Sequence, residues 1–185
     1  MSLDRLIEKI AELKNPTVAG LDPKLSYIPD FIKQDAFRRH GETLEGAAEA
    51  LLQFNRGLID ALCDIVPAVK PQCAYYEMYG WPGLRALAET IRYAKEKGLF
   101  VITDGKRNDI GSTMEAYAAA HLGEVSINGH PFAPFGADAC GNWKKPERTP
   151  VLRLSLSVCL LMRKDWRSWL SHWLKVRNNM ISASH

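Results

Sequence analysis

The stretch Phe100-Val-Ile-Thr-Asp-Gly-Lys-Arg-Asn-Asp-Ile-Gly-Ser-Thr113 decides the fold of this chain. Residues 99–103 are apolar and rich in β-branched side chains, which is typical of a strand buried on both faces of a parallel sheet. Asp104, Lys106 and Asp109 follow within six positions. We expect the strand to continue to Lys106, so that Asp104 and Lys106 share one face. Charged groups at the C-terminal end of a strand occupy the place where parallel α/β folds carry their chemistry.

The segments around this stretch alternate between helical and strand patterns. Ser112-Thr-Met-Glu115 has the form of a capping box that opens a helix over 112–122. Apolar spacing and breakers predict further helices and strands. The helices cover 3–13, 42–65 and 81–97, and the strands cover 17–22, 68–72 and 99–106. This β/α alternation predicts a parallel sheet.

The other two predicted strands each carry a charged residue at or near their end. Asp22 closes the first, although on its own an aspartate before Pro23 is equally a turn residue. Lys70 lies in the second, and a lysine there either finds an anion or reaches water as an exposed edge residue. The residues alone leave both alternatives open.

The pattern Asp104-x-Lys106-x-x-Asp109-Ile110-Gly111-x-Thr113 resembles the signature of the orotidine 5'-phosphate decarboxylase family. Other segments are similar to pieces of the same family. They are Gly-Leu-Asp-Pro at 20–23, Phe-Asn at 54–55, Val-Lys-Pro-Gln at 69–72, and a proline- and glycine-rich connector at 128–138 like that of the longer bacterial form. For Asn55 we favour packing or capping over a role in the site. The similarity ends at about Ala139.

The resemblance implies a (β/α)8 TIM barrel and a set of site residues. Lys106 would stabilise the developing negative charge and donate the proton, and Asp104 would hold Lys106 in place. Lys70 would continue the alternation of charges and reach a ribose hydroxyl, and Asp22 would also bind a ribose hydroxyl. Asp109, with Ile110 and Thr113 on the substrate-binding side, would be donated across a two-fold interface. The family needs no metal and no cofactor, so we expect none, with a nucleotide as substrate and a homodimer as the active unit.

The length of the chain limits how much of that barrel it can form. A complete barrel takes about 250 residues, and this chain has 185. We therefore predict an α/β fold of the TIM-barrel type, truncated to its N-terminal half, with residues 1–139 as the barrel-like domain. Residues 140–185 are expected to form a separate basic tail, in which we identify no pyrimidine loop and no phosphate loop.

Composition changes abruptly at this boundary. Residues 140–185 contain nine Lys or Arg, two Asp or Glu, and four of the five tryptophans. Basic residues interleaved with tryptophan suit a nucleic-acid or membrane-surface module. A frameshifted or truncated gene would produce the same change, and we expect no nucleic-acid partner.

Cysteine usage and hydropathy favour a cytoplasmic protein. The four cysteines lack metal-ligand spacing, and Cys63 and Cys73 lie in apolar patterns typical of reduced core thiols. No run approaches the roughly 20 apolar residues of a membrane span, and the N-terminus lacks the apolar core of a signal peptide. We expect neither export nor insertion.

Several functions remain in competition. The first is decarboxylation of orotidine 5'-monophosphate to UMP. A metal-dependent sugar-phosphate enzyme such as hexulose-phosphate synthase shares the Asp-x-Lys-x-x-Asp strand, but Lys70 is a poor neighbour for a cation. The others are an inactive half-barrel and a tail that acts as an interaction module. Without a phosphate loop, we expect the chain as written to be a poor catalyst or none.

Overall fold

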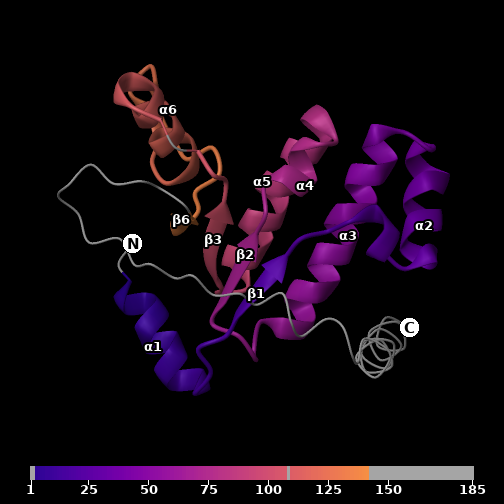
Figure 1. Cartoon of the computed structure of the whole chain (residues 1–185), viewed down its shortest axis with the longest axis horizontal. Coiled ribbons are helices and arrows are strands. Elements are labelled where there is room, and N and C mark those ends of the chain that lie inside the picture. The colour runs from indigo at the N-terminus through magenta and orange to yellow at the C-terminus, as the bar shows by residue number, and fades with distance from the viewer. Residues whose placement is uncertain (1–2, 108, 142–185) are drawn as a thin grey trace. The chain divides into compact units, whose positions relative to one another are not determined.

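The computed structural model describes residues 3–107 and 109–141, and these form a parallel α/β sheet with helices packed on it (Figure 1). The sheet has the strand order β1-β2-β3-β6. Its strands are β1 (Val18–Leu21), β2 (Ala68–Pro71), β3 (Phe100–Asp104) and β6 (Ala139–Gly141). All three pairings are parallel. The predicted parallel sheet is therefore confirmed.

The register of the strands divides their side chains between two faces. Val18 pairs with Ala68, Ala68 with Phe100, and Ile102 with Ala139, so these residues lie on one face. We call this face the inner face, because α3 and α5 pack on the other. Asp104, at the end of β3, belongs to the inner face too. The charged strand ends are thus brought to one edge of one face.

The outer face is closed by a layer of helices. The helices that precede and follow β2 are α3 (Leu44–Leu62), α4 (Ala74–Glu77) and α5 (Gly80–Glu96). Helix α5 packs against β2, β3 and α3. The strand residues below them, Leu21, Val69 and Val101, are at most 1% exposed. Burial on this scale, at about 25 cal/mol per Å² of apolar surface, is the main stabilising contribution to the layer.

Two short segments extend this helical layer and were not predicted from the sequence. They are η1 (Leu25–Tyr27), a 3-10 turn, and α2 (Asp30–His40), which packs beside α3 (Figure 1). Helix α2 buries only Ile32 and Ala36, so its apolar pattern is weak. Helix α3 begins two residues later than expected, because the Thr43 hydroxyl accepts a hydrogen bond from the Gly46 amide and caps it.

The N-terminal helix covers the inner face at the end opposite to the charged residues. Helix α1 (Asp4–Leu13) places Leu6 in a cluster with Val18, Ala68 and Phe100. Ile10, Ile102 and Ala139 pack against this cluster at its border. One end of the inner face is therefore an apolar core, and the other carries the charges.

Asn55 is a packing residue, as expected. It is fully buried on α3, where its Nδ2 donates to the Tyr76 hydroxyl at 2.8 Å and to the Thr90 hydroxyl at 3.4 Å. Tyr76 lies on α4 and Thr90 on α5. The amide thus joins three helices through one buried polar group, which needs such partners to avoid a desolvation cost.

The fourth strand of the sheet is formed by residues at the limit of the family resemblance. Its position is fixed by Asp138, whose enclosed carboxylate accepts a hydrogen bond from the Val101 amide at 2.9 Å. Lys95 Nζ lies 3.4 Å from the same carboxylate. Cys140 and Gly141 then pair with Thr103 and Asp104, so the fourth strand runs two residues past Ala139, where the family resemblance ends.

Between β3 and β6 the chain forms α6 (Gly111–His121) and a hairpin, in place of a plain connector. The hairpin consists of β4 (Val125–Ile127) and β5 (His130–Phe132). Asn128 and Gly129 both have positive φ, at 51° and 84°, which a two-residue turn of this kind requires.

Three local predictions need correction. The third strand ends at Asp104, two residues early, because the backbone leaves the extended conformation at Lys106, which has a φ of 48°. Ser112 does not cap the following helix: α6 begins at Gly111 after an extended Ile110, and no side-chain hydrogen bond caps it. Cys63 is half-buried beside the end of α3, whereas Cys73 is a buried thiol as expected.

Predictions for residues 140–185 fall, beyond Gly141, outside the part of the chain that the structure describes. Within the described part, no helix has both the length and the apolar character needed to cross a lipid bilayer.

We predict that acidification destabilises the fold through His121. This residue is 5% exposed and stacks on Phe135 with 4.9 Å between ring centroids. Burial, and then the charge of Arg107, lowers the pKa of His121 below its usual value of 6.5. The unfolded chain therefore binds the proton more readily. Stability is full above about pH 6.5 and falls as the pH drops below it, by at most about 1.4 kcal/mol per pH unit.

Urea unfolding of the wild type and of His121→Gln at about pH 7.5 and about pH 5.5 checks this prediction. The midpoint of the wild type should fall more between the two pH values than that of the variant. Equal falls would show that other groups carry the pH dependence.

Candidate active site

The carboxylate of Asp104 is the centre of the charged cluster at the C-terminal edge of the sheet. Its Oδ2 accepts hydrogen bonds from Lys70 Nζ at 3.0 Å and from Gln72 Nε2 at 2.8 Å. Its Oδ1 accepts one from Lys106 Nζ at 3.2 Å. The side chain of Asp104 is 14% exposed, against 31% for Lys70 and 60% for Lys106. One largely buried anion is thus held between two cations.

Strand pairing accounts for the arrangement on the β2 side. Lys70 and Gln72 are two residues apart, so their side chains point to the same face. Gln72 forms an isolated parallel bridge with Asp104, which brings the end of β2 level with the end of β3. The Cys73 amide also donates to the Asp104 carbonyl at 3.2 Å. Backbone pairing therefore positions Asp104 independently of the charges around its carboxylate.

Lys106 reaches Asp104 from a turn and not from a strand. Its backbone has a φ of 48°, in the left-handed region, which costs a residue with a Cβ on the order of 1 kcal/mol. The shared-face argument is therefore wrong for Lys106, even though the two side chains do meet. The long, flexible side chain of Lys106 lets its ammonium contact the Asp104 carboxylate even though the backbone has turned away from the strand direction.

The two lysines determine the ionisation of Asp104. Burial by itself would raise the pKa of this carboxyl, but the hydrogen bonds and charges of Lys70 and then Lys106 outweigh burial. The net effect lowers the pKa of Asp104 below its ordinary value. The carboxylate consequently remains charged at neutral pH.

Asp22 lies close enough to the same cluster to feel its charges. It follows β1 directly, one residue beyond the end of the strand that was predicted to include it. Loss of hydration raises the pKa of Asp22, Lys70 acts against this rise, and the negative charge of Asp104 adds to it. No direct hydrogen bond between Asp22 and the two lysines is found among the described residues. Asp22 is thus a neighbour of the network and not one of its hydrogen-bonded members.

The remaining predicted site residues are exposed and lie on the segment that leads into α6 or on its first turn. Asp109 Oδ1 accepts a hydrogen bond from the Ile110 amide at 2.8 Å, a strictly local contact. Ile110 is 86% exposed, and Thr113 is exposed on the first turn of α6. Within the described chain, no hydrogen bond or ion pair connects these three residues to the cluster. The structure therefore brings together Lys70, Asp104 and Lys106, with Asp22 nearby, and leaves the other three apart.

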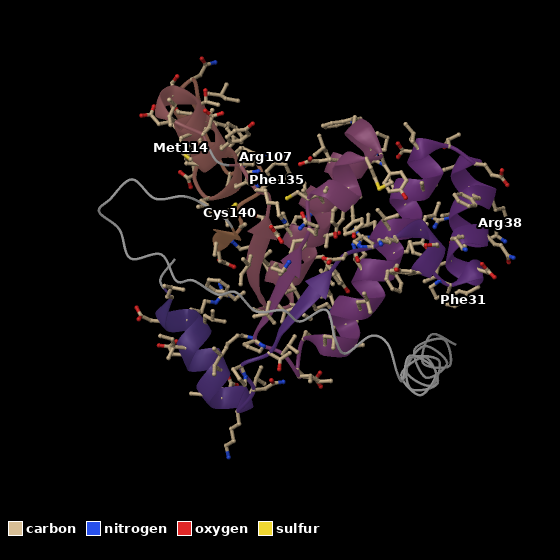
Figure 2. The ribbon with its side chains drawn as sticks, viewed as in Figure 1. Phe31, Arg38, Arg107, Met114, Phe135 and Cys140 are labelled. Carbon is tan, nitrogen blue, oxygen red and sulfur yellow. The ribbon has the colours of Figure 1, made fainter. Side chains whose placement is uncertain are left out.

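Sequence reasoning missed two contributors to this site. Gln72 could have been found, because it is two residues beyond Lys70 and must share its face. The pairing of Arg107 with Glu77 could not, because 30 residues separate them and only the fold brings α4 beside the turn after β3. In Figure 2 Arg107 lies with Phe135 and Cys140 where the chain passes from β3 to α6.

The chemistry available to this cluster follows from its charges. An ammonium group at Lys106 can stabilise negative charge that develops on a nearby atom and can then transfer a proton to it. Asp104 can hold that ammonium or repel an anionic group placed beside it. Over the described residues, no three His, Cys, Asp or Glu side chains are positioned to share a metal ion.

A four-stranded parallel β/α array with its charges at the C-terminal strand ends is the architecture of one part of a TIM barrel. The family model for the "Orotidine 5'-phosphate decarboxylase / HUMPS family" matches residues 41–138 of this chain. The chain therefore belongs to that family, which confirms the resemblance and the predicted barrel-type fold.

Individual relatives agree with this assignment. An orotidine 5'-phosphate decarboxylase of Caldicellulosiruptor saccharolyticus is 38% identical over 136 residues, which cover 74% of this chain and 45% of the relative. One from Rhodopirellula baltica is 43% identical over 123 residues, which cover 66% of this chain and 39% of the relative. The chain thus spans less than half the length of these curated relatives.

The same part of the fold appears in a solved structure. A Toxoplasma gondii protein described as an orotidine-monophosphate decarboxylase has a TM-score of 0.52 to this chain at 28% identity. The match covers 63% of this chain and 35% of that one. The described residues accordingly correspond to part of a complete barrel.

We predict that removing the charge of Lys70 raises the pKa of Asp104. Lys70→Met keeps a long, unbranched side chain but removes the hydrogen bond and the charge that lower this pKa most. The pKa of Asp104 is lower in the folded state than in the unfolded chain. The ionised side chain therefore stabilises the fold above about pH 4, and this stabilisation is lost as the pH falls further. The variant should lose less stability than the wild type over that acid range.

Carboxyl carbon shifts of Asp104, followed by NMR through an acid titration, measure the change directly. Lys33→Met is the control, because Lys33 pairs with Asp30 at 2.8 Å on the distant helix α2. An unchanged Asp104 titration in Lys70→Met would contradict the assigned cause.

Proposed function

We propose that this chain carries the charge network of an orotidine 5'-phosphate decarboxylase, the enzyme that converts orotidine 5'-monophosphate to UMP and CO2. The observation that supports it best is the Asp104 carboxylate held between Lys70 and Lys106 at the strand ends. The names of the relatives point to the same reaction.

In the proposed reaction the bond between C6 of the pyrimidine and its carboxylate breaks. The electron pair remains on C6, and CO2 leaves. The Lys106 ammonium stabilises the negative charge and donates a proton to C6, which gives UMP, and solvent then reprotonates the lysine. This combines electrostatic stabilisation with general acid catalysis, and it calls for no metal or cofactor.

Asp104 has two roles in this proposal. It holds the Lys106 ammonium in place through the 3.2 Å contact. Its negative charge also lies beside the position proposed for the substrate carboxylate, so that loss of neutral CO2 relieves a repulsion. Lys70 keeps Asp104 ionised, as the lowered pKa of that carboxyl indicates. Asp22 and Lys70 would bind the ribose hydroxyls.

The proposed active unit is a homodimer with shared sites. Asp109, Ile110 and Thr113 are exposed and take no part in their own chain's cluster. They are therefore free to enter the site of a second subunit, with Asp109 of the partner subunit completing the alternation of charges. A cytoplasmic location is proposed with this metabolic role.

A metal-dependent reaction on sugar phosphates is the competing proposal within the same family. It requires a divalent cation among carboxylates. Here the Lys70 ammonium, 3.0 Å from Asp104, occupies the position beside that carboxylate and would repel such a cation. We therefore favour decarboxylation. A turnover assay with and without EDTA separates the two reactions.

The described strands form one part of a barrel, and a grip on the remote phosphate has not been identified in this sequence. Binding energy from such a group is what holds the reacting carbon against the lysine. We accordingly propose that the 185-residue chain is a weak catalyst by itself. A kcat/KM of about 10⁴ M⁻¹s⁻¹ or more on orotidine 5'-monophosphate would contradict this.

We predict that Lys106→Ala abolishes turnover in a complete barrel. A suitable protein joins residues 1–141 of this chain to the remainder of the Caldicellulosiruptor saccharolyticus relative. UMP formation should become undetectable, because the same ammonium supplies both the stabilising charge and the proton. Lys9→Ala, on the helix α1 that covers the opposite end of the sheet, is the control. Activity within tenfold of the parent would correspond to less than about 1.4 kcal/mol, too little for this role.

We also predict that two inactive variants of this chimera complement each other. The Lys106→Ala and Asp109→Ala chains, unfolded together and refolded as a mixture, should recover about a quarter of the parent activity. About half of the dimers then contain one chain of each kind, and one of the two sites in each mixed dimer has both residues intact. Lys106→Ala mixed with Asp104→Ala serves as the control, since both defects lie on the same side of the shared site. Recovery in neither mixture would overturn the shared-site dimer.

A further inference from the structure

The turn that carries Lys106 is held by contacts outside the charged cluster. Lys106 has a left-handed backbone, with a φ of 48°, and it follows Gly105, which is buried. Such a conformation persists only where surrounding contacts determine it. The hydrogen bond from Lys106 to Asp104 does not fix the backbone, because it is made by the far end of a flexible side chain.

Arg107 provides contacts that do fix it. Its Nη1 donates to the Gly105 carbonyl at 2.8 Å, directly across the Lys106 residue. Its Nη2 forms a hydrogen-bonded ion pair with Glu77 on helix α4. The guanidinium also lies 5.8 Å from the ring centroid of Tyr117 on α6. One side chain therefore ties the turn to both neighbouring helices.

The geometry of arginine matters in this position. Its guanidinium presents separate nitrogens in a rigid plane, so it can bond a carbonyl and a carboxylate at the same time. A lysine would carry the same charge on a single nitrogen and could not reproduce both contacts in these directions. The side chains of Arg107 and Glu77 are 28% and 34% exposed, so water only partly screens their attraction.

We propose that Arg107 and Glu77 are positioning residues that hold the left-handed turn and thereby keep the Lys106 ammonium against Asp104. They act through Lys106, and neither is assigned a contact with substrate. The importance of this placement for turnover rests on the proposed function. The effect on Lys106 itself does not, so the two can be tested separately.

The first test measures the environment of Lys106 in the 185-residue chain without any substrate. Limited acetylation with a water-soluble acetyl ester, followed by mass spectrometry, gives the modification rate of each lysine. Lys70 is the internal reference, because it lies in β2 and not in the turn. In Arg107→Ala the ratio of the Lys106 rate to the Lys70 rate should rise about threefold, on the scale of a lost, partly exposed ion pair.

Two conservative variants separate the two-contact geometry from charge alone. Arg107→Lys should raise the ratio as well, since it keeps the charge but loses one contact. Glu77→Gln should also raise the ratio, because it removes the negative charge that pairs with Arg107. Arg56→Ala is the matched control: Arg56 pairs with Glu89 at 3.0 Å and lies 5.6 Å from the Tyr93 ring, far along the chain from the turn. It should leave the ratio unchanged.

The outcomes decide the proposal. A selective rise at Lys106 in all three variants supports it. An unchanged ratio, a wild-type ratio in Arg107→Lys, or an equal acceleration at Lys106 and Lys70 overturns it, the last because it would show general loosening. Circular dichroism verifies folding, and if Arg107→Ala fails to fold, the other two variants carry the test.

The second test connects positioning to turnover in the chimeric barrel. Arg107→Ala should lower kcat by about a hundredfold while KM changes little, since a displaced group costs rate more than binding. An unchanged kcat alongside a raised acetylation ratio would refute the catalytic importance of the turn. Loss of the proposed function would show separately, as full turnover in Lys106→Ala.

Discussion

The contact between Lys70 on β2 and Asp104 on β3 is the interaction on which the rest of the site depends. It links neighbouring parallel strands at their C-terminal ends, 3.0 Å apart, and it keeps a largely buried carboxylate ionised. Without Lys70, burial would raise the pKa of Asp104 and the charge of Lys106 alone would oppose that rise. The ion pair with Lys70 therefore strengthens the anion that holds the Lys106 ammonium in place.

The fold supplies this contact through backbone pairing. Strands β1, β2 and β3 run parallel and in register, and the bridge between Gln72 and Asp104 extends the pairing past the end of β2. The inner face is apolar at one end, where α1 contributes Leu6 to the core, and charged at the other. The outer face is closed by α3 and α5. This separation lets the sheet be stabilised by burial at one end while it keeps polar groups partly hydrated at the other.

The site also contains a departure from regular strand geometry. Lys106 departs from the strand and adopts a left-handed backbone, and the side chain of Arg107 ties that turn to its neighbours. A regular strand through Lys106 would have satisfied the sequence pattern equally well. In the strained turn, which has additional contacts from α4 and α6, the side chain of Lys106 starts from a different backbone position than it would in a continued strand. It is at such sites that propensity and observed structure are expected to differ.

The sequence by itself determined the parallel β/α alternation, because buried strands and amphipathic helices have different periods. It also marked Asp22, Lys70 and Asp104, because each stands where an apolar run ends. Gln72 was within its reach, since two residues beyond Lys70 must share a face. Only the tertiary structure decided that Lys106 meets Asp104 from a turn, that Cys140 continues the sheet, and that Glu77 supports Arg107. These depend on backbone reversals and on contacts between residues 30 or more positions apart, which no local pattern encodes.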